Sequence, residues 1–105
     1  MSYTFHSDCG HGWLEVPARE IRDLGIEGDI SGYSYISTDG MTVYLEEDCD
    51  EGVFIKAVTR RNYPYGKGDS FVNCVHHDGD CFIRELASYK GTLRDDGATL
   101  KRCDL

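Results

Sequence analysis

The chain has 105 residues, and its 11 Lys and Arg residues against 19 Asp and Glu residues give a formal net charge of -8 at pH 7. This length suits one domain, so we expect residues 1–105 to fold around one core. An aromatic content of 11% argues against a disordered chain, the acidity argues against a direct nucleic-acid binder, and no apolar run is long enough for a membrane span.

Cysteine usage and the N-terminus both bear on the compartment. The first residues lack the basic and then apolar pattern of a secretory signal, which favours a cytoplasmic protein. The five cysteines are an odd number, and in a cytoplasm they are expected to be free thiols: Cys9, Cys49, Cys74, Cys81 and Cys103.

The first predicted element is a short helix that starts at Pro17, a residue favoured at the first helical position. Ile21 and Leu24 lie on one face of this helix. Gly25 followed by Ile26 is typical of a helix C-cap with its hydrophobic contact.

The next predicted element is a β-hairpin centred on Asp39-Gly40, which lies between two runs rich in Tyr, Ile, Val and Thr. Asp-Gly suits a type I′ turn because both central residues need a positive φ. In the second strand, alternation predicts that Met41, Val43 and Leu45 face the core.

A second helix is predicted from Asp48, whose carboxylate would accept the free backbone amides while Glu51 reaches back. Phe54, Ala57 and Val58 give it an apolar stripe. Residues 61–68, with one proline and two glycines, are predicted as a loop.

Two more Asp-Gly pairs predict further hairpins. Asp78-Gly79 would join residues 70–76 to residues 80–86, and Asp96-Gly97 would join residues 92–94 to residues 99–102. The predicted fold is therefore α+β, an antiparallel sheet of hairpins with two short helices packed on one face.

The acidic residues are concentrated in one half of the chain. Residues 1–51 hold twelve acidic and two basic residues, whereas residues 52–105 hold seven and nine. The densest acidic run comprises Glu46, Glu47, Asp48, Asp50 and Glu51. Such a run is commonly a solvated face or a helix start, but it would also attract a basic partner protein and repel phosphate.

Histidine and cysteine form the one residue set that suggests a metal. The two groups are His6, Cys9 and His11 near the N-terminus, and Cys74, His76, His77 and Cys81 around the predicted second hairpin. Thiolates with imidazoles would select zinc. Neither group has a paired C-x2-C spacing, so the favoured interpretation is structural and no cofactor is expected. A Cys–His nucleophile has no supporting motif, and no catalytic residue is predicted.

Large aromatic residues supply candidate anchors for a partner. Trp13 follows Gly10-His-Gly12, and Tyr33 and Tyr35 lie in the first strand of the predicted hairpin. Each could instead be an ordinary core residue. If they are exposed, Trp and Tyr are the residues that dominate interface energetics.

Three blocks of sequence carry a resemblance to a known family. They are Cys9-Gly-His-Gly-Trp-Leu-Glu-Val-Pro17, Ile30-Ser-Gly-Tyr-Ser-Tyr35 and Val43-Tyr-Leu-Glu-Glu-Asp-Cys-Asp50. Together they resemble a family of small uncharacterised proteins encoded by bacteriophages, prophages and plasmids. The resemblance implies a mobile-element origin and a bacterial cytoplasm, and it implies no catalytic residues.

These observations lead to one principal hypothesis and two alternatives. The principal hypothesis is a non-enzymatic protein that inhibits a host defence or nucleic-acid-handling protein, for example a CRISPR effector. It would bind a basic protein or nucleoprotein complex through the acidic run with Trp13, Tyr33 and Tyr35, without contacting nucleic acid or a membrane. The alternatives are a zinc- or ligand-binding domain or minor enzyme that uses the Cys/His groups, and a phage protein with no role in defence.

Overall fold

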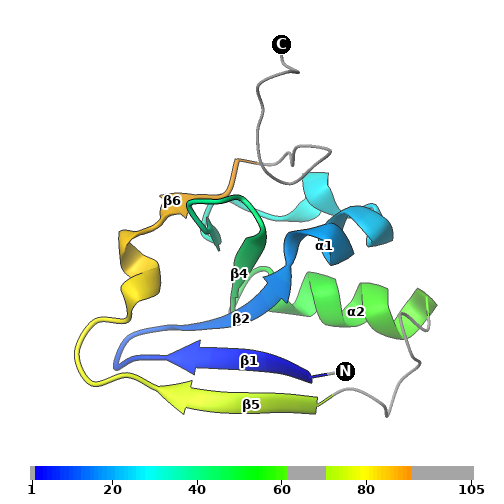
Figure 1. Ribbon diagram of the computed structural model, residues 1–105. Coiled ribbons are helices and arrows are strands. Elements are labelled where there is room, and N and C mark those ends of the chain that lie inside the picture. Colours follow the sequence, from blue (N-terminus) through cyan, green and yellow to red (C-terminus); the bar gives the residue numbers. More distant parts are fainter. Residues whose placement is uncertain (1, 62–70, 91–105) are drawn as a thin grey trace.

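A computed structural model describes residues 2–61 and 71–90 of the chain (Figure 1). Among these residues, no helix has the length and apolar character needed to cross a membrane. The elements in chain order are β1 (Ser2–Ser7), β2 (Gly12–Pro17), α1 (Ala18–Leu24), the 3-10 helix η1 (Glu27–Asp29), β3 (Tyr35–Ile36), β4 (Thr42–Glu46), α2 (Glu51–Arg61), β5 (Phe71–His76), the 3-10 helix η2 (Phe82–Glu85) and β6 (Ala87–Ser88).

The strands form one six-stranded mixed sheet in the order β5-β1-β2-β4-β3-β6. β1 pairs with β5 in parallel, and every other pairing is antiparallel. The predicted α+β class is confirmed. The prediction of a purely antiparallel sheet is wrong. The edge strand β5 pairs in parallel with β1, instead of forming an antiparallel hairpin with the residues that follow it in the sequence.

Both α-helices cover one face of the sheet, as predicted (Figure 1). Successive strand residues point to opposite faces, so Leu14 and Val16 of β2 lie beside Val43 and Leu45 of β4. All four side chains are fully buried with Phe54 of α2 in the main core.

The opposite face is covered by the segment that contains η2, which Figure 1 shows in yellow. Here Trp13 and Tyr44, which alternate with the main-core residues on β2 and β4, pack with Cys81 and Ile83. The centre of the sheet, at β2 and β4, is therefore buried on both sides. This second layer was not predicted from the sequence.

The first helix ends as predicted. Gly25 adopts a left-handed conformation with φ 71°, and its N–H donates to the Arg22 carbonyl. The N–H of buried Ile26 donates to the Ile21 carbonyl, which completes a Schellman cap. Pro17 lies just before the helix, where its missing N–H costs no hydrogen bond.

The hairpin at Asp39-Gly40 forms between β3 and β4, but its turn is longer than the predicted two residues. The Gly40 N–H donates to the Ser37 carbonyl, and the Ser37 N–H donates to the Thr42 carbonyl. Residues 38–41 therefore form the loop. Val43 and Leu45 face the core as predicted, whereas Met41 belongs to the loop and is 51% exposed.

The second helix begins at Glu51 rather than at Asp48. The backbone amides of Asp48 and Cys49 donate to the Glu46 carboxylate, so the residues before the helix form a turn. Phe54 and Ala57 are buried, which confirms the predicted apolar stripe.

The predicted second hairpin is wrong. Gly79 has φ 74° and does mark a turn, but the residues after it form η2 instead of a strand. Residues 71–76 pair with β1, from which they are separated by about 70 positions. The loop was predicted at 61–68, but Arg61 is the last residue of α2. Residues 62–68 of that loop and the predicted ribbon at 92–102 lie outside the described residues.

Candidate functional site

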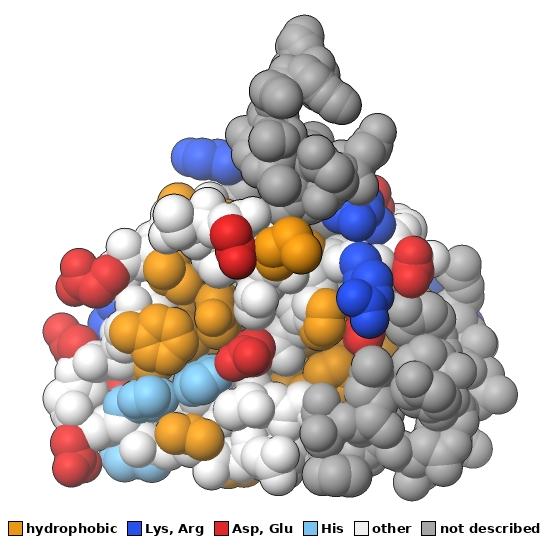
Figure 2. All heavy atoms as spheres, in the orientation of Figure 1, with side chains coloured by type: hydrophobic (Ala, Val, Ile, Leu, Met, Phe, Trp, Pro, Cys, Tyr) orange, Lys and Arg blue, Asp and Glu red, His pale blue; other side chains and the backbone are white. Residues whose placement is uncertain are grey.

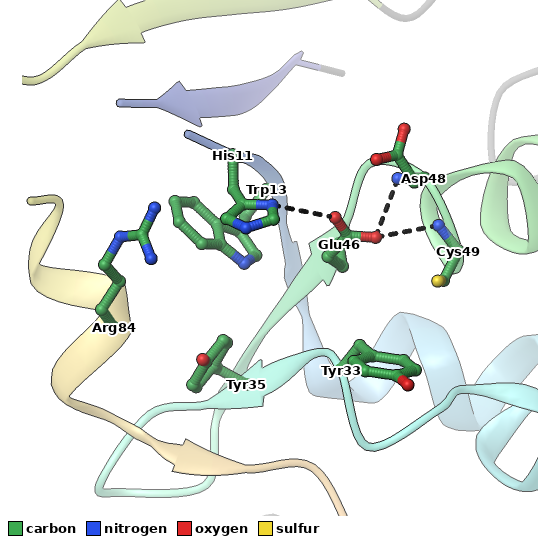
Figure 3. Close-up of a pocket in the computed structure, with 8 residues that line it drawn as sticks. All are labelled: His11, Trp13, Tyr33, Tyr35, Glu46, Asp48, Cys49 and Arg84. Atoms are coloured by element: carbon green, nitrogen blue, oxygen red, sulfur yellow. Dashed lines mark hydrogen bonds and ion pairs between the residues drawn. The ribbon is translucent and has the colours of Figure 1, made fainter. Parts of the chain in front are cut away.

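A pocket of about 290 Å³ lies where β2, β3 and the end of β4 meet the η2 segment (Figure 3). It contains five of the eight residues that the sequence predicted for partner binding: Trp13, Tyr33, Tyr35, Glu46 and Asp48. Three further lining residues were not predicted for partner binding: His11, Cys49 and Arg84.

Aromatic rings form two sides of this pocket. Trp13 and Tyr35 meet edge to face, with ring centroids 6.2 Å apart. Trp13 is 2% exposed, and among the described side chains its indole Nε1 is the one buried polar atom without a hydrogen-bond partner. Figure 3 shows this nitrogen on the edge of the ring turned toward Tyr33 and Tyr35. Because this nitrogen is itself buried, it lies behind the surface of the pocket, which is formed by the aromatic rings and not by the N–H group.

Carboxylates form another side. Glu46 Oε1 accepts the backbone N–H groups of Asp48 and Cys49 at 2.8 and 3.0 Å, and Oε2 lies 3.6 Å from His11 Nδ1 (Figure 3). These contacts hold the Glu46 side chain in one position, with little of it exposed. Asp48 is exposed at the rim. The two carboxylates give this side of the pocket a negative charge.

Arg84 also reaches the pocket, with its guanidinium carbon 5.4 Å from the centre of the Trp13 ring. It is held by Asp8, through Nε at 2.6 Å and Nη2 at 2.9 Å. Asp8 additionally accepts the N–H groups of Gly10, His11 and Cys81. The Arg84 hydrogen bonds, followed by the backbone amides, hold the pKa of Asp8 far below its usual range. Because Asp8 neutralises Arg84, the acidic groups dominate the charge of the pocket.

Tyr33 stands on a loop that Asp50 fixes. The Asp50 carboxylate accepts hydrogen bonds from the Ser31 N–H, the Ser31 hydroxyl and the Ser34 hydroxyl. Asp50 itself is 2% exposed, whereas Tyr33 is 71% exposed. Asp50, which was predicted to face a partner, therefore acts inside the chain by positioning the loop that carries Tyr33.

The acidic run is divided between several environments. Glu46 and Asp50 are buried, Glu47 and Asp48 are exposed, and Glu51 is partly buried in the first turn of α2. Glu47 follows Glu46 on the chain and lies close to Gly12. Burial and the charge of Glu47 raise the pKa of Glu51. Glu46 and Asp48 are the acids of this run that line the pocket.

The histidines and cysteines are also rearranged relative to the two groups in the sequence. Among the described residues, the ligand atoms of His6, His77 and Cys81 lie within 4.8 Å of one another. Cys9 and Cys74 are exposed free thiols, Cys49 and Cys81 are free as well, and His76 contacts the Ser7 hydroxyl. Figure 2 shows pale-blue histidine side chains beside an orange hydrophobic area on this face.

Cys49 brings a thiol to the lining of the pocket. Burial, a hydrogen bond to Glu46 and nearby acids raise the pKa of the Cys49 thiol, so it stays protonated at neutral pH. A protonated thiol is a poor nucleophile. Aromatic faces beside carboxylates instead form a good environment for an organic cation.

In comparisons with known proteins, no family model, curated protein or solved structure matches the chain.

Proposed function

We propose that this chain is a protein-binding domain that takes a Lys or Arg side chain of a basic partner into the pocket formed by Trp13, Tyr33, Tyr35, Glu46 and Asp48. The observation that carries the proposal is the meeting of three aromatic residues and two carboxylates around one pocket. Such a pocket complements a cationic side chain.

Each side of the pocket has a part in this recognition. Glu46 and Asp48 face the incoming ammonium or guanidinium group, and the rings of Tyr33 and Tyr35 shield it from water. A cation over an aromatic face gains about 0.5–1 kcal/mol at an exposed site and about 2 kcal/mol when desolvated.

The partner we propose is a protein or nucleoprotein complex with a surface rich in lysine and arginine. The net charge of -8 favours encounter with such a surface and disfavours direct contact with nucleic acid. Combined with the resemblance to proteins of phages and plasmids, this extends the proposal to an inhibitor of a bacterial nucleic-acid-handling or defence protein, acting in the host cytoplasm without enzymatic activity.

Trp13 is the one tryptophan of the chain, so its fluorescence reports directly on the pocket. We would titrate the full chain with a lysine-rich peptide without aromatic residues, and in parallel with a glutamate-rich peptide of the same length. The lysine-rich peptide is expected to change the Trp13 emission with saturation, and the change should weaken as salt is added. An unchanged emission with both peptides would refute the proposal.

Two pocket variants and one matched control separate the pocket from overall charge. Asp48→Asn and Tyr33→Ala change exposed side chains, and each is expected to weaken peptide binding about 2- to 10-fold, as the loss of roughly 0.5–1.4 kcal/mol implies. Asp29→Asn removes the same charge from an exposed position in η1 and is not expected to matter beyond a small salt-dependent effect. Equal weakening by Asp29→Asn and Asp48→Asn would leave net charge as the cause and contradict the pocket.

The partner class is tested by competition. Basic proteins captured from a bacterial lysate by the full chain would be compared with those captured by the Asp48→Asn, Tyr33→Ala double variant. A protein bound only by the unmodified chain should be displaced by the nucleic acid it normally binds. A captured partner that binds the chain and its nucleic acid simultaneously would contradict inhibition by occupation of its nucleic-acid surface.

A further inference from the structure

A second site lies on the same face of the sheet as the pocket and shares no lining residue with it. His6 of β1, His77 after β5 and Cys81 before η2 bring their ligand atoms within 4.8 Å of one another. His6 Nδ1 and His77 Nε2 are 3.0 Å apart. These residues come from three separate segments, so this convergence depends on the tertiary fold.

The orientation of His6 is fixed by a carboxylate. Its Nε2 lies 2.7 Å from Glu15 Oε1 on the neighbouring strand. Because an ionised carboxylate only accepts hydrogen bonds, Nε2 carries the hydrogen, and the lone pair of neutral His6 lies on Nδ1, toward His77 and Cys81. A histidine that donates to a carboxylate through one nitrogen and offers the other to an ion is the usual arrangement in zinc sites.

We infer that His6, His77 and Cys81 bind one Zn²⁺ ion, with Glu15 as the residue that positions His6. Two imidazoles and a thiolate match the preference of zinc for nitrogen and sulfur ligands. Tetrahedral zinc with Zn–N of about 2.0–2.1 Å and Zn–S of about 2.3 Å places its ligand atoms about 3.3–3.6 Å apart. In the structure the two histidine nitrogens are 3.0 Å apart and all three ligand atoms lie within 4.8 Å of one another, a range that includes these values.

The surroundings of the cluster favour a bound ion. Cys81 is 1% exposed and His6 is 8% exposed. The rings of Tyr44 and Phe82 meet the His6 ring edge to face, with centroids 6.0 and 5.5 Å away. An apolar shell of this kind limits solvent access and strengthens the interaction between the ion and its anionic ligand. Three protein ligands leave a fourth position for water, as in other zinc sites with an open coordination position.

Zinc at this site would join parts of the chain that are far apart in sequence. His6 and Cys81 are separated by 75 positions, and the ion would tie β1 to the segment that covers the second face of the sheet. Because the unfolded chain does not hold these three ligands together, it binds zinc more weakly than the folded chain does, and zinc binding therefore stabilises the folded state.

The test uses the full chain, stripped of metal with a chelator under reducing conditions. Zinc is titrated against a chromophoric zinc indicator, and Co²⁺ is added in a parallel sample as a spectroscopic substitute. We expect one Zn²⁺ per chain, a higher midpoint of thermal unfolding with zinc, and a Co²⁺ spectrum with a charge-transfer band for one thiolate. The absence of binding at micromolar zinc, or a Co²⁺ spectrum without thiolate, would overturn the inference.

Variants then assign the ligands. Cys81→Ser, which changes little in shape, should abolish the thiolate band, and Glu15→Gln should weaken zinc binding about 10- to 100-fold while the band remains. Cys74→Ser and Cys103→Ser are the controls and should bind as the unmodified chain does. Circular dichroism confirms that each variant is folded. Binding that survives Cys81→Ser, or that is lost in either control, would overturn the assignment.

Discussion

At the scale of single residues, Asp8 joins two segments that are distant in the sequence. Its two oxygens accept five hydrogen bonds, from the amides of Gly10, His11 and Cys81 and from two nitrogens of Arg84. It thereby fixes the β1–β2 turn to the start of η2. Because Arg84 lines the pocket, the charge of Asp8 also determines the geometry of the candidate binding site.

This arrangement predicts a loss of stability in acid. The folded-state pKa of Asp8 lies below its ordinary value of 3.8, so its stabilising contribution is complete above about pH 4 and is lost as the pH falls toward the folded-state pKa. We therefore expect the midpoint temperature of unfolding to decrease when the pH is lowered below about 4. Asp8→Asn should lower the midpoint at neutral pH and make the acid dependence shallower, as measured by circular dichroism.

The exposed acid Asp29 supplies the control for this prediction. Asp29→Asn should leave both the neutral midpoint and its acid dependence close to those of the unmodified chain. Parallel pH curves for the unmodified chain and Asp8→Asn would show that another group governs the acid transition.

The site could be predicted from the sequence only in part. Trp13, Tyr33, Tyr35, Glu46 and Asp48 were identifiable because large aromatics and a dense acidic run are local features. Arg84 and the pairing of His6 with His77 were not, because they depend on the position of the η2 segment over the sheet. The burial of Asp50 was equally hidden, since it depends on two serines that lie 16 and 19 positions earlier.

At the scale of elements, a glycine substitution tests how much the C-terminal cap of α1 contributes to stability. Gly25 has φ 71° and open space where a Cβ would lie, so Gly25→Ala adds backbone strain without a steric clash. We expect it to lower the free energy of unfolding by about 1–2 kcal/mol. Gly28→Ala, also in open space but without a positive φ, should change it little. Urea denaturation measures both, and equal effects would show that the left-handed cap does not limit stability.

Gly52 predicts the opposite result. It lies in the first turn of α2, is exposed, and has open space where a Cβ would lie. Alanine reduces the entropy lost when a helical residue is ordered, so Gly52→Ala should raise the free energy of unfolding by about 0.5–1 kcal/mol. Urea denaturation again measures the change. A decrease would mean that the helix needs the freedom of glycine at its start.

The elements that were predicted correctly from the sequence are those whose structure depends on residues close together in the chain. The cap at Gly25 and the hairpin at Asp39-Gly40 are examples, since a turn and the strands or helix beside it span few positions. The pair Asp78-Gly79 illustrates the limit of this reasoning. It does form a turn, but the residues after it form the 3-10 helix η2 instead of the predicted strand. Ile83 of η2 packs with Trp13 and Tyr44 of the sheet, which is a tertiary contact that the local pattern does not contain.

At the scale of the whole molecule, the parallel pairing of β1 with β5 determines the architecture. Local sequence patterns do not indicate which distant strand will pair with a given strand. For this reason the Asp-Gly pairs predict hairpins between strands that are adjacent in the sequence. The pairing places η2 over the second face of the sheet. Both the candidate pocket and the His6–His77–Cys81 cluster arise from this placement.

The two hydrophobic clusters are predicted to unfold together. β2 contributes Leu14 to the cluster under the helices and Trp13 to the cluster under η2, so neither can be disrupted without disturbing the shared strand. Trp13 fluorescence reports on the η2 side, whereas far-ultraviolet circular dichroism reports chiefly on the helices. In urea, the two signals should give coincident transitions.

Substitutions in each of the two hydrophobic clusters test directly whether the clusters unfold together. Leu45→Ala in the helix-side cluster and Ile83→Ala in the η2-side cluster both remove fully buried side chains, and each should cost about 2–5 kcal/mol. Each should shift the fluorescence and dichroism transitions by the same amount, while Met41→Ala, at a half-exposed position, should shift neither appreciably. A shift of the fluorescence transition alone by Ile83→Ala would mean that the η2 layer opens separately from the rest of the fold. The pocket and the His6–His77–Cys81 cluster would then form and disappear with that layer.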